Sequence, residues 1–184
     1  MVFYLLITIA LVLIGLLYFL GLRLIKNQVD ALHALSGHFS GYIPWYSRVF
    51  KKRLSFVGCF SGHTFTFAFG AAHSVIIEYL ARSKSKLRIY MYRSNPGPVL
   101  FAQRIYTNDA ALDQYFLYSN MPSEAVLYFN DSSKLSAIKQ LLQAGWEPPL
   151  ITARKIVIEV KNITTEITPQ FIQEMLERLI VLRN

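Results

Sequence analysis

The first 22 residues form an unbroken apolar run. Residues 2–22 contain no charged residue and no proline. A helix of that length spans about 31 Å, against about 30 Å for the hydrocarbon core of a bilayer. Tyr4 and Tyr18 stand toward the two ends of the run, where aromatic rings favour the membrane–water interface. We therefore predict a single transmembrane anchor helix over residues 1–24.

A cleaved signal peptide is the main alternative for this segment. It requires a basic N-terminal region and small residues at the cleavage site. Residues 1–22 hold no Lys or Arg, and they end in a bulky stretch, Tyr18–Leu22. We therefore expect an uncleaved anchor. Gly15 and Gly21 are the positions where a partner helix would approach it, although they lack the spacing of four that is typical of close helix pairs.

Residues 25–53 are predicted to join the anchor to the rest of the chain. Ile25, Val29 and Leu32 recur at spacings of four and three, which indicates an amphipathic helical stalk. A loop rich in rings and cations follows, and it is typical of an interfacial segment on anionic lipid. An ordinary basic loop that leads into a strand is the alternative. The loop residues concerned are Tyr42, Trp45, Tyr46, Arg48, Lys51, Lys52 and Arg53.

From residue 54 the apolar positions change to the period of two that is typical of strands. In the clearest case Phe65, Phe67 and Phe69 share one face of a strand over residues 63–69. An antiparallel meander of five strands is predicted, the other four lying at residues 54–60, 75–80, 87–92 and 99–106. A second membrane helix over residues 54–80 is the alternative. The alternation, two histidines and several glycines in that stretch argue against it.

The last third of the chain mixes helical and strand patterns. Strands are predicted at residues 115–118, 150–152 and 155–161, and helices at residues 122–129, 134–144 and from 169 to about 182. Ser132 or Ser133 is the expected cap of the middle helix, and Thr168 precedes a first-turn proline in the last. The fold class is therefore α+β, with a mostly antiparallel sheet packed against C-terminal helices in a domain over residues 54–184.

Charge is distributed unevenly along the chain. Residues 1–104 hold 12 Lys and Arg against two acids, whereas residues 105–184 hold seven against nine. Arg23 and Lys26 follow the anchor and no cation precedes it. Positive flanks stay in the cytoplasm, so we predict a protein of the cytoplasmic membrane with its N-terminus outside and its domain inside the cell. The other predicted docking cations are Arg82, Lys84, Lys86, Arg88 and Arg93.

Several partners would suit this basic membrane-proximal surface. An anionic leaflet attracts each well-placed cation by about 1 kcal/mol. An acidic surface of an integral membrane protein would dock there as well. Nucleic acid is disfavoured, because no recognition motif is present and the anchor restricts access. A solvated basic face without a partner is the remaining alternative.

No constellation of catalytic residues stands out. The histidines lack a second ligand at metal-binding spacing, and the chain has one cysteine. Cys59 or Ser61 with His63 as base is the one hydrolase-like arrangement, but Cys59 is expected to be a small buried residue. Asp109 and Asp113 are expected in a solvated turn rather than as a carboxylate pair. We therefore expect no enzyme, no metal site and no cofactor.

These features favour a non-enzymatic, single-pass membrane protein. We expect it to act as an accessory or scaffold subunit of a larger membrane protein complex, docking through its basic face. The alternative is a membrane-tethered module that binds a small molecule or lipid, in which Phe65, Phe67 and Phe69 line a cavity instead of a core.

Overall fold

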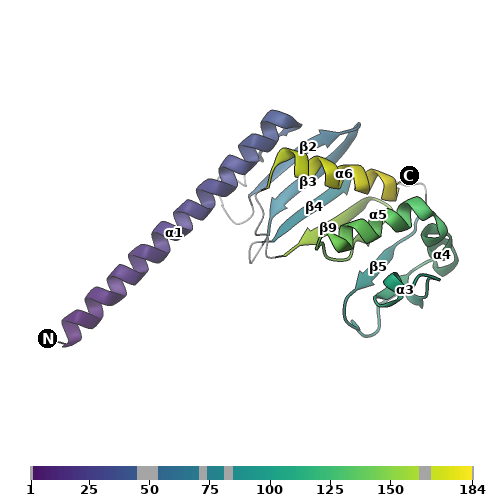
Figure 1. Ribbon diagram of the computed structural model, residues 1–184, viewed down its shortest axis with the longest axis horizontal. Helices are drawn as coiled ribbons and strands as arrows, with labels where there is room; N and C mark the ends of the chain where they lie inside the picture. Colours follow the sequence, from purple (N-terminus) through teal and green to yellow (C-terminus); the bar gives the residue numbers. More distant parts are fainter. Residues whose placement is uncertain (1, 45–53, 71–73, 81–84, 162–166, 184) are drawn as a thin grey trace.

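An N-terminal helix projects from an α+β body in the computed structural model of the chain (Figure 1). The structure describes residues 2–44, 54–70, 74–80, 85–161 and 167–183. The helices are α1 (Val2–His38), α3 (Ala110–Asp113), α4 (Pro122–Asn130), α5 (Ser132–Gln143) and α6 (Pro169–Arg183). The strands are β1 (Ser40–Tyr42), β2 (Ser55–Phe60), β3 (His63–Phe69), β4 (Val75–Leu80), β5 (Ile89–Tyr92), β6 (Gln103–Ile105), β7 (Phe116–Ser119), β8 (Leu150–Ile151) and β9 (Lys155–Val160).

The predicted anchor and stalk are one continuous helix, α1. Its most apolar 18-residue window has a mean hydropathy of 2.1, and no part of that window is buried by the rest of the chain. By length and composition α1 is therefore able to cross a membrane. Near the other end, Leu32 and Leu35 are buried in the body, and this end contacts β1, β2 and α6. A single helix thus has a bare apolar length and a packed length.

Nine strands of the described chain form one antiparallel sheet in the order β1-β2-β3-β4-β9-β8-β5-β7-β6. Helices α5 and α6 lie over one face of this sheet (Figure 1). The predicted fold class, an apolar N-terminal helix followed by an antiparallel sheet and C-terminal helices, is confirmed.

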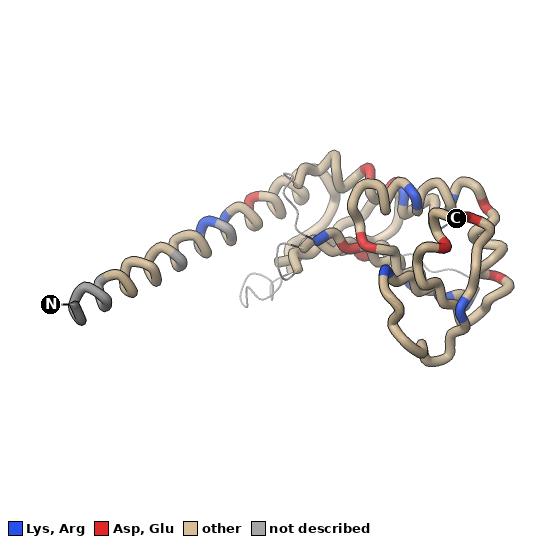
Figure 2. Tube along the Cα trace, turned by 60° about the horizontal axis from the view of Figure 1, so that its bottom comes forward, with Lys and Arg blue, Asp and Glu red and all other residues tan. Residues whose placement is uncertain are grey.

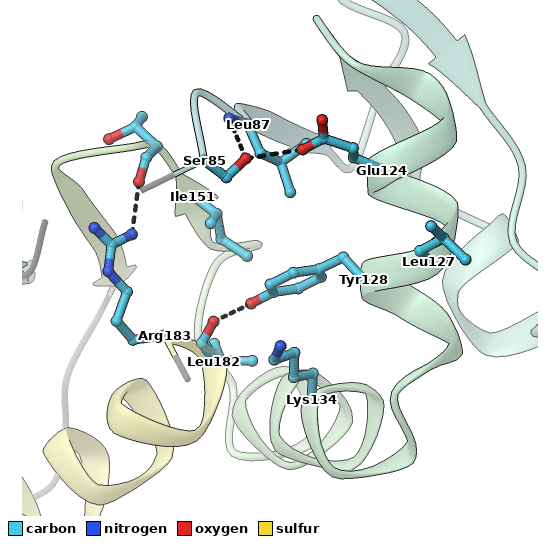
Figure 3. A pocket seen from close by; sticks show the side chains of 10 residues that line it. Ser85, Leu87, Glu124, Leu127, Tyr128, Lys134, Ile151, Leu182 and Arg183 are labelled. Carbon is cyan, nitrogen blue, oxygen red and sulfur yellow. Dashed lines mark hydrogen bonds between the residues drawn. The ribbon is translucent and has the colours of Figure 1, made fainter. Parts of the chain in front are cut away.

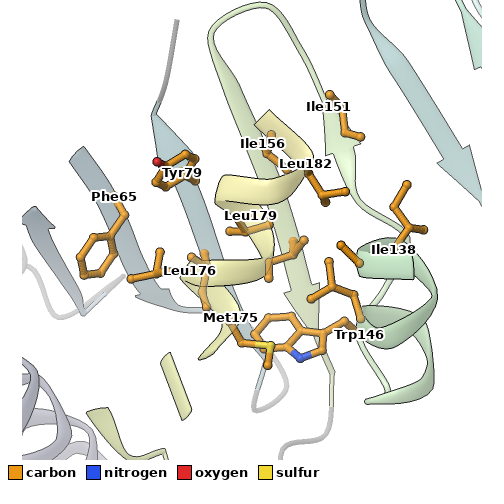
Figure 4. Packing of buried hydrophobic residues seen from close by; sticks show 14 of the residues in the cluster. Phe65, Tyr79, Ile138, Trp146, Ile151, Ile156, Met175, Leu176, Leu179 and Leu182 are labelled. Atoms are coloured by element: carbon orange, nitrogen blue, oxygen red, sulfur yellow. The ribbon is translucent and has the colours of Figure 1, made fainter. Parts of the chain in front are cut away.

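The core lies between the sheet and these helices. Phe65 and Phe67 are completely buried and belong to the hydrophobic core. From the helical side, α6 contributes the buried stripe of Ile172, Met175, Leu176, Leu179 and Leu182. Figure 4 shows Leu176 directed toward Phe65 of β3, and Met175 directed toward Trp146 in the segment between α5 and β8. Burial of this apolar surface stabilises the body.

Strands β2, β3 and β4, not a second membrane helix, occupy the described parts of residues 54–80. Strand β2 pairs with β3 in a register that ends at Phe60 opposite His63. The turn between them has positive φ angles at Ser61 (49°) and Gly62 (77°), as a tight two-residue hairpin requires. The predicted turn at these two residues is therefore confirmed.

The predicted five-strand meander is wrong beyond β4. Strand β9 pairs with β4 over six residues, from Val75 opposite Val160 to Leu80 opposite Lys155. Strand β8 follows, and β5 joins the sheet at Ile89 opposite Ile151. Strand β9 brings the alternately buried Ile156 and Ile158 to the core. A late strand therefore separates two early ones, which short-range patterns do not reveal.

Several local predictions also need correction. The strand predicted over residues 99–106 is reduced to β6, because Phe101 has a φ of 59° and the chain turns there. Asp131 caps α5, not Ser132 or Ser133: its side chain accepts from the backbone N–H of Ser133 and Lys134. Strand β1 and helix α3 were not predicted. Cys59 is exposed rather than buried.

Candidate functional site

A cavity of about 290 Å³ opens between α4, the end of α6 and β8. Its apolar lining comes from four aliphatic side chains, Leu87, Leu127, Ile151 and Leu182. Its polar lining consists of Ser85, Glu124, Tyr128, Lys134, Thr152 and Arg183 (Figure 3). The volume is at the lower limit of small-molecule sites, which run from about 300 Å³ upward.

Tyr128 is the central polar residue of the cavity. Its hydroxyl donates to the backbone carbonyl of Leu182, which ties α4 to the end of α6. The Lys134 ammonium lies 4.8 Å from the centre of the Tyr128 ring. Burial raises the pKa of Tyr128 far above its usual range. The hydroxyl therefore stays protonated at neutral pH and acts as a donor, not as a base.

Arg183 closes one side of the cavity. Its guanidinium donates to the backbone carbonyls of Thr152 (2.9 Å) and Ala153 (2.7 Å), so it ties α6 to the turn between β8 and β9. Burial lowers the pKa of Arg183, and the nearby Tyr128 opposes that shift. An arginine remains charged in spite of such a shift.

Most of the polar lining is thus already engaged in holding the fold. The Ser85 hydroxyl donates to Glu124 (2.8 Å) and accepts from the backbone N–H of Leu87 (3.0 Å). The Lys134 Nζ forms an ion pair with the Asp131 Oδ2 at 3.5 Å. The cavity is therefore better suited to enclosing a small, mostly apolar molecule than to moving protons.

The predicted anchor positions lie on the bare length of α1. Tyr18 is exposed, and nothing in the described chain approaches a Cβ placed at Gly15 or Gly21. Tyr4 lies within the same helix. Arg23 and Lys26 are exposed and form the blue band between this bare length and the body in Figure 2.

The predicted docking cations do not lie on one surface of the described chain. Tyr42 is exposed on the edge strand β1, beside α1. Lys86 and Arg88 are also exposed, but they precede β5, which β3, β4, β9 and β8 separate from the β1–β2 edge. Trp45, Tyr46, Arg48, Lys51, Lys52, Arg53, Arg82 and Lys84 lie outside the described residues.

Arg93 has a structural role that the sequence did not indicate. Its Nε donates to Glu147 at 2.9 Å, and its guanidinium donates to the backbone carbonyl of Trp146 at 3.2 Å. Arg93 therefore ties the end of β5 to the segment that joins α5 to β8.

Neither Cys59 with His63 nor Asp109 with Asp113 is arranged for catalysis. Cys59 and His63 lie on opposite faces of the sheet. Gly58 pairs with the buried Phe65 on the core face, so the next residue, Cys59, lies on the other face. His63 lies two residues before Phe65 and shares its face. Asp109 caps α3 and its carboxylate accepts from Lys139. That hydrogen bond holds the pKa of Asp109 below its usual range.

Asp113 is likewise used structurally. Its carboxylate accepts from both the backbone N–H (2.7 Å) and the hydroxyl (2.8 Å) of Thr107. Among the residues that the structure describes, no three His, Cys, Asp or Glu side chains meet as they would around a metal ion.

One surface feature was missed because it was assigned to a strand. Leu100 and Phe101 are almost fully exposed in the loop between β5 and β6. The signal was present in the sequence, since two prolines and a glycine precede an apolar Val-Leu-Phe run, and prolines and glycines favour loops over strands.

The sequence matches no family model and no curated protein. The chain is similar in fold to the crystal structure of the mycobacterial trehalose monomycolate transport factor A, TtfA. The two share 10% sequence identity at a TM-score of 0.60, over 87% of this chain and 92% of that one. At this identity the likeness shows a common fold alone, and the function has to be argued from the residues.

Proposed function

We propose that this chain is a non-enzymatic, single-pass membrane protein that serves as an accessory subunit of a larger membrane protein complex. The observation that carries the proposal is α1, which is apolar and bare over its first part and buried in the body at Leu32 and Leu35. A helix of this kind holds the body at a fixed place beside a bilayer. The fold shared with a transport factor supports an accessory role.

The docking mechanism would use both parts of the chain. The bare length of α1 packs against lipid or the helices of an integral membrane partner, with Gly15 and Gly21 as the points of closest approach. The exposed cations Arg23 and Lys26 meet anionic headgroups. Lys86 and Arg88 present a separate basic area to an acidic surface of the partner.

Native extraction tests the accessory role. The membrane is solubilised in a mild detergent, and the migration of this chain on a native gel is followed by mass spectrometry of the band. We expect migration in an assembly well above the 21.1 kDa of the chain. Migration of the wild-type chain as a monomer under the gentlest extraction would sink the proposal.

Charge reversal locates the docking surface within such an assembly. The double variant Lys86→Glu/Arg88→Glu is expected to weaken the assembly, because it reverses an exposed basic area. Arg154→Glu changes the charge of an exposed arginine outside the predicted surface and serves as the matched control. Equal retention of the assembly by both variants would exclude this area and leave α1 as the docking element.

The orientation of the body is part of the proposal, and Cys59 reports on it directly. Cys59 is exposed on β2 and is the one cysteine of the chain. With the body in the cytoplasm, a membrane-impermeant maleimide leaves Cys59 unmodified in intact cells and modifies it after permeabilisation. Cys59→Ser shows the background. Labelling in intact cells would place the body outside.

The cavity of Figure 3 supports a second candidate, a membrane-tethered module that binds a small molecule. Its four aliphatic side chains are the specific observation in favour. Native mass spectrometry of the full chain should then show an adduct that Leu127→Arg removes. Leu127 is exposed at the rim of the cavity, so this change leaves the core intact.

A further inference from the structure

The loop between β5 and β6 has a defined shape that displays two apolar side chains. Two turns build it: the backbone N–H of Gly97 donates to the Asn95 side chain (3.0 Å), and the N–H of Ala102 donates to the carbonyl of Val99 (3.3 Å). Pro96 and Pro98 fix their own φ angles. The loop therefore presents its tip in one conformation without help from a packed core.

The tip carries Leu100, which is 83% exposed, and Phe101, which is 94% exposed. Phe101 also has a φ of 59°, in the left-handed region that an aromatic residue rarely adopts. Exposure of two adjacent large apolar side chains to water is unfavourable for folding, and the left-handed backbone at Phe101 adds conformational strain. Such a combination points to a binding surface.

Behind the tip lie a tyrosine and an arginine. Tyr106 is exposed beyond the edge strand β6. The Arg104 guanidinium lies 4.9 Å from the centre of the Tyr106 ring and 4.7 Å from that of Phe116. The ion pairs found among the described residues do not include Arg104. We name Leu100, Phe101, Arg104 and Tyr106 the edge-loop patch.

Carboxylates are absent from the loop and from strands β5 and β6, and the nearest ones in the chain, Asp109 and Asp113, are engaged by Lys139 and Thr107. Residues 79–108 contain no Asp or Glu, so an approaching anion meets no carboxylate from the loop or from β5 and β6. The three parts of the patch match the three layers of a leaflet. The apolar tip suits the hydrocarbon, the tyrosine ring suits the interface, and the arginine suits the lipid phosphates. An acidic protein groove would match the arginine but would not match a tip of two bare apolar side chains as well.

The position of the loop also favours a bilayer. In Figure 1 the arrow of β5 points down, and the loop that follows forms the lower edge of the body, the N-terminus of α1 also lying low in that view. The loop and the bare end of α1 thus lie toward the same lower edge of this view. The membrane would lie on that side, because the bare length of α1 is the part of the chain able to cross it.

We propose that the edge-loop patch is a second membrane contact, which inserts Leu100 and Phe101 into the leaflet next to the body while Arg104 meets a lipid phosphate. The contact is independent of the accessory role proposed above, because it needs only this chain and lipid. It would hold the body against the membrane at a point remote from α1.

The test uses the full chain in nanodiscs that contain phosphatidylcholine and phosphatidylglycerol. In a Cys59→Ser background, a polarity-sensitive fluorophore is attached through Leu100→Cys, and in a control protein through Ser136→Cys on the exposed surface of α5. The label at position 100 should show blue-shifted, several-fold brighter emission that nitroxide-labelled lipids quench. A label at position 100 that behaves like the one at position 136 would overturn the proposal.

Two further variants separate insertion from a folding defect. Phe101→Asn introduces a residue that tolerates the left-handed conformation. It should therefore leave the melting temperature unchanged while the label at position 100 moves into water. Arg104→Gln should weaken insertion more in phosphatidylglycerol-containing discs than in pure phosphatidylcholine. Emission that depends on an added partner protein and not on lipid would assign the patch to that protein and refute the membrane contact.

Discussion

Gly58 shows how closely two strands and the core approach one another at the residue scale. A Cβ at this position would lie 2.6 Å from the Phe56 ring and 2.7 Å from the Phe65 ring. Both rings are completely buried, so neither has room to yield. The glycine is therefore required by packing against its neighbours, not by its own backbone angles.

The variant Gly58→Ala tests this packing. We expect it to lower the free energy of unfolding by about 1–3 kcal/mol, as overpacking in a rigid core does. Gly37→Ala is the matched control, because a Cβ there meets nothing within 4 Å and alanine is favoured in a helix. Equal stability of the two variants in denaturant titrations would contradict the predicted clash.

Tyr128 gives a pH dependence whose sign follows from its raised pKa. In the unfolded chain the hydroxyl ionises near pH 10, whereas in the folded chain it keeps its proton. Its contribution to stability is therefore complete below about pH 10 and declines above it. Relative to Tyr128→Phe, which lacks the hydrogen bond to Leu182, the wild type should be more stable by about 1 kcal/mol at pH 7.

That advantage should shrink between about pH 10 and pH 11, and thermal unfolding of both proteins across this range measures it. The other tyrosines are common to both proteins and cancel in the difference. A constant difference across the range would show that Tyr128 ionises equally in the folded and unfolded chains.

Two residue-level expectations were confirmed, and both have a local cause. Thr168 accepts from the backbone N–H of Phe171 at the start of α6, as its position before a proline suggested. The alternation of phenylalanines on β3 placed Phe65 and Phe67 in the core. The exposure of Cys59 was not predictable, because it depends on which neighbours cover that face of β2.

At the scale of elements, Arg93 shows why charge patterns alone did not identify the docking surface. In the sequence it is one of five cations between residues 82 and 93. In the structure it joins β5 to the segment before β8 through Glu147 and Trp146. Its partner comes from 54 residues away in the chain, so no local pattern contains the pairing.

Arg93→Gln should therefore act on stability. We expect a loss of about 0.5–1 kcal/mol, because the ion pair is half exposed and screened by solvent. Arg88→Gln removes an exposed arginine and should leave stability within about 0.5 kcal/mol of the wild type. A larger loss for Arg88→Gln than for Arg93→Gln would reverse the assignment.

The existence of most helices and strands could be predicted from apolar spacing, but the order of the strands could not. The spacing of apolar residues indicates which face of a helix or strand is buried, but it carries no information about which other element that strand pairs with. The insertion of β9 and β8 between β4 and β5 depends on pairing across more than 70 residues, as between Lys155 and Leu80. Sequence patterns do not choose between such distant partners and nearer ones.

For the whole molecule, the boundary of the independently stable body lies inside α1. Ile25 and Val29 pack partly against the core, and Leu32 and Leu35 are buried in it. Among the described side chains of the earlier part of α1, residues 9–21, none belongs to that core. Removal of residues 1–22 should therefore leave the melting temperature of the body unchanged and strongly weaken membrane association, with the edge-loop patch as the remaining contact.

Removal of residues 1–36 should instead destabilise the body, by about 2–5 kcal/mol for each of the two buried leucines. Circular dichroism melts of the two truncated proteins measure the contrast. If both truncations melted alike, the packed length of α1 would have no part in the stability of the body.

The continuity of α1 has a mechanical consequence. In the proposed membrane arrangement this uninterrupted helix runs from the bilayer to the core and transmits any tilt to the body, because it contains no break at which the tilt is absorbed. Transmembrane helices tilt to match the thickness of the surrounding membrane. A change in membrane thickness would thus change the tilt of α1 and move the whole body toward or away from the lipid surface. The distance between the body and the membrane would then depend on the thickness of the membrane.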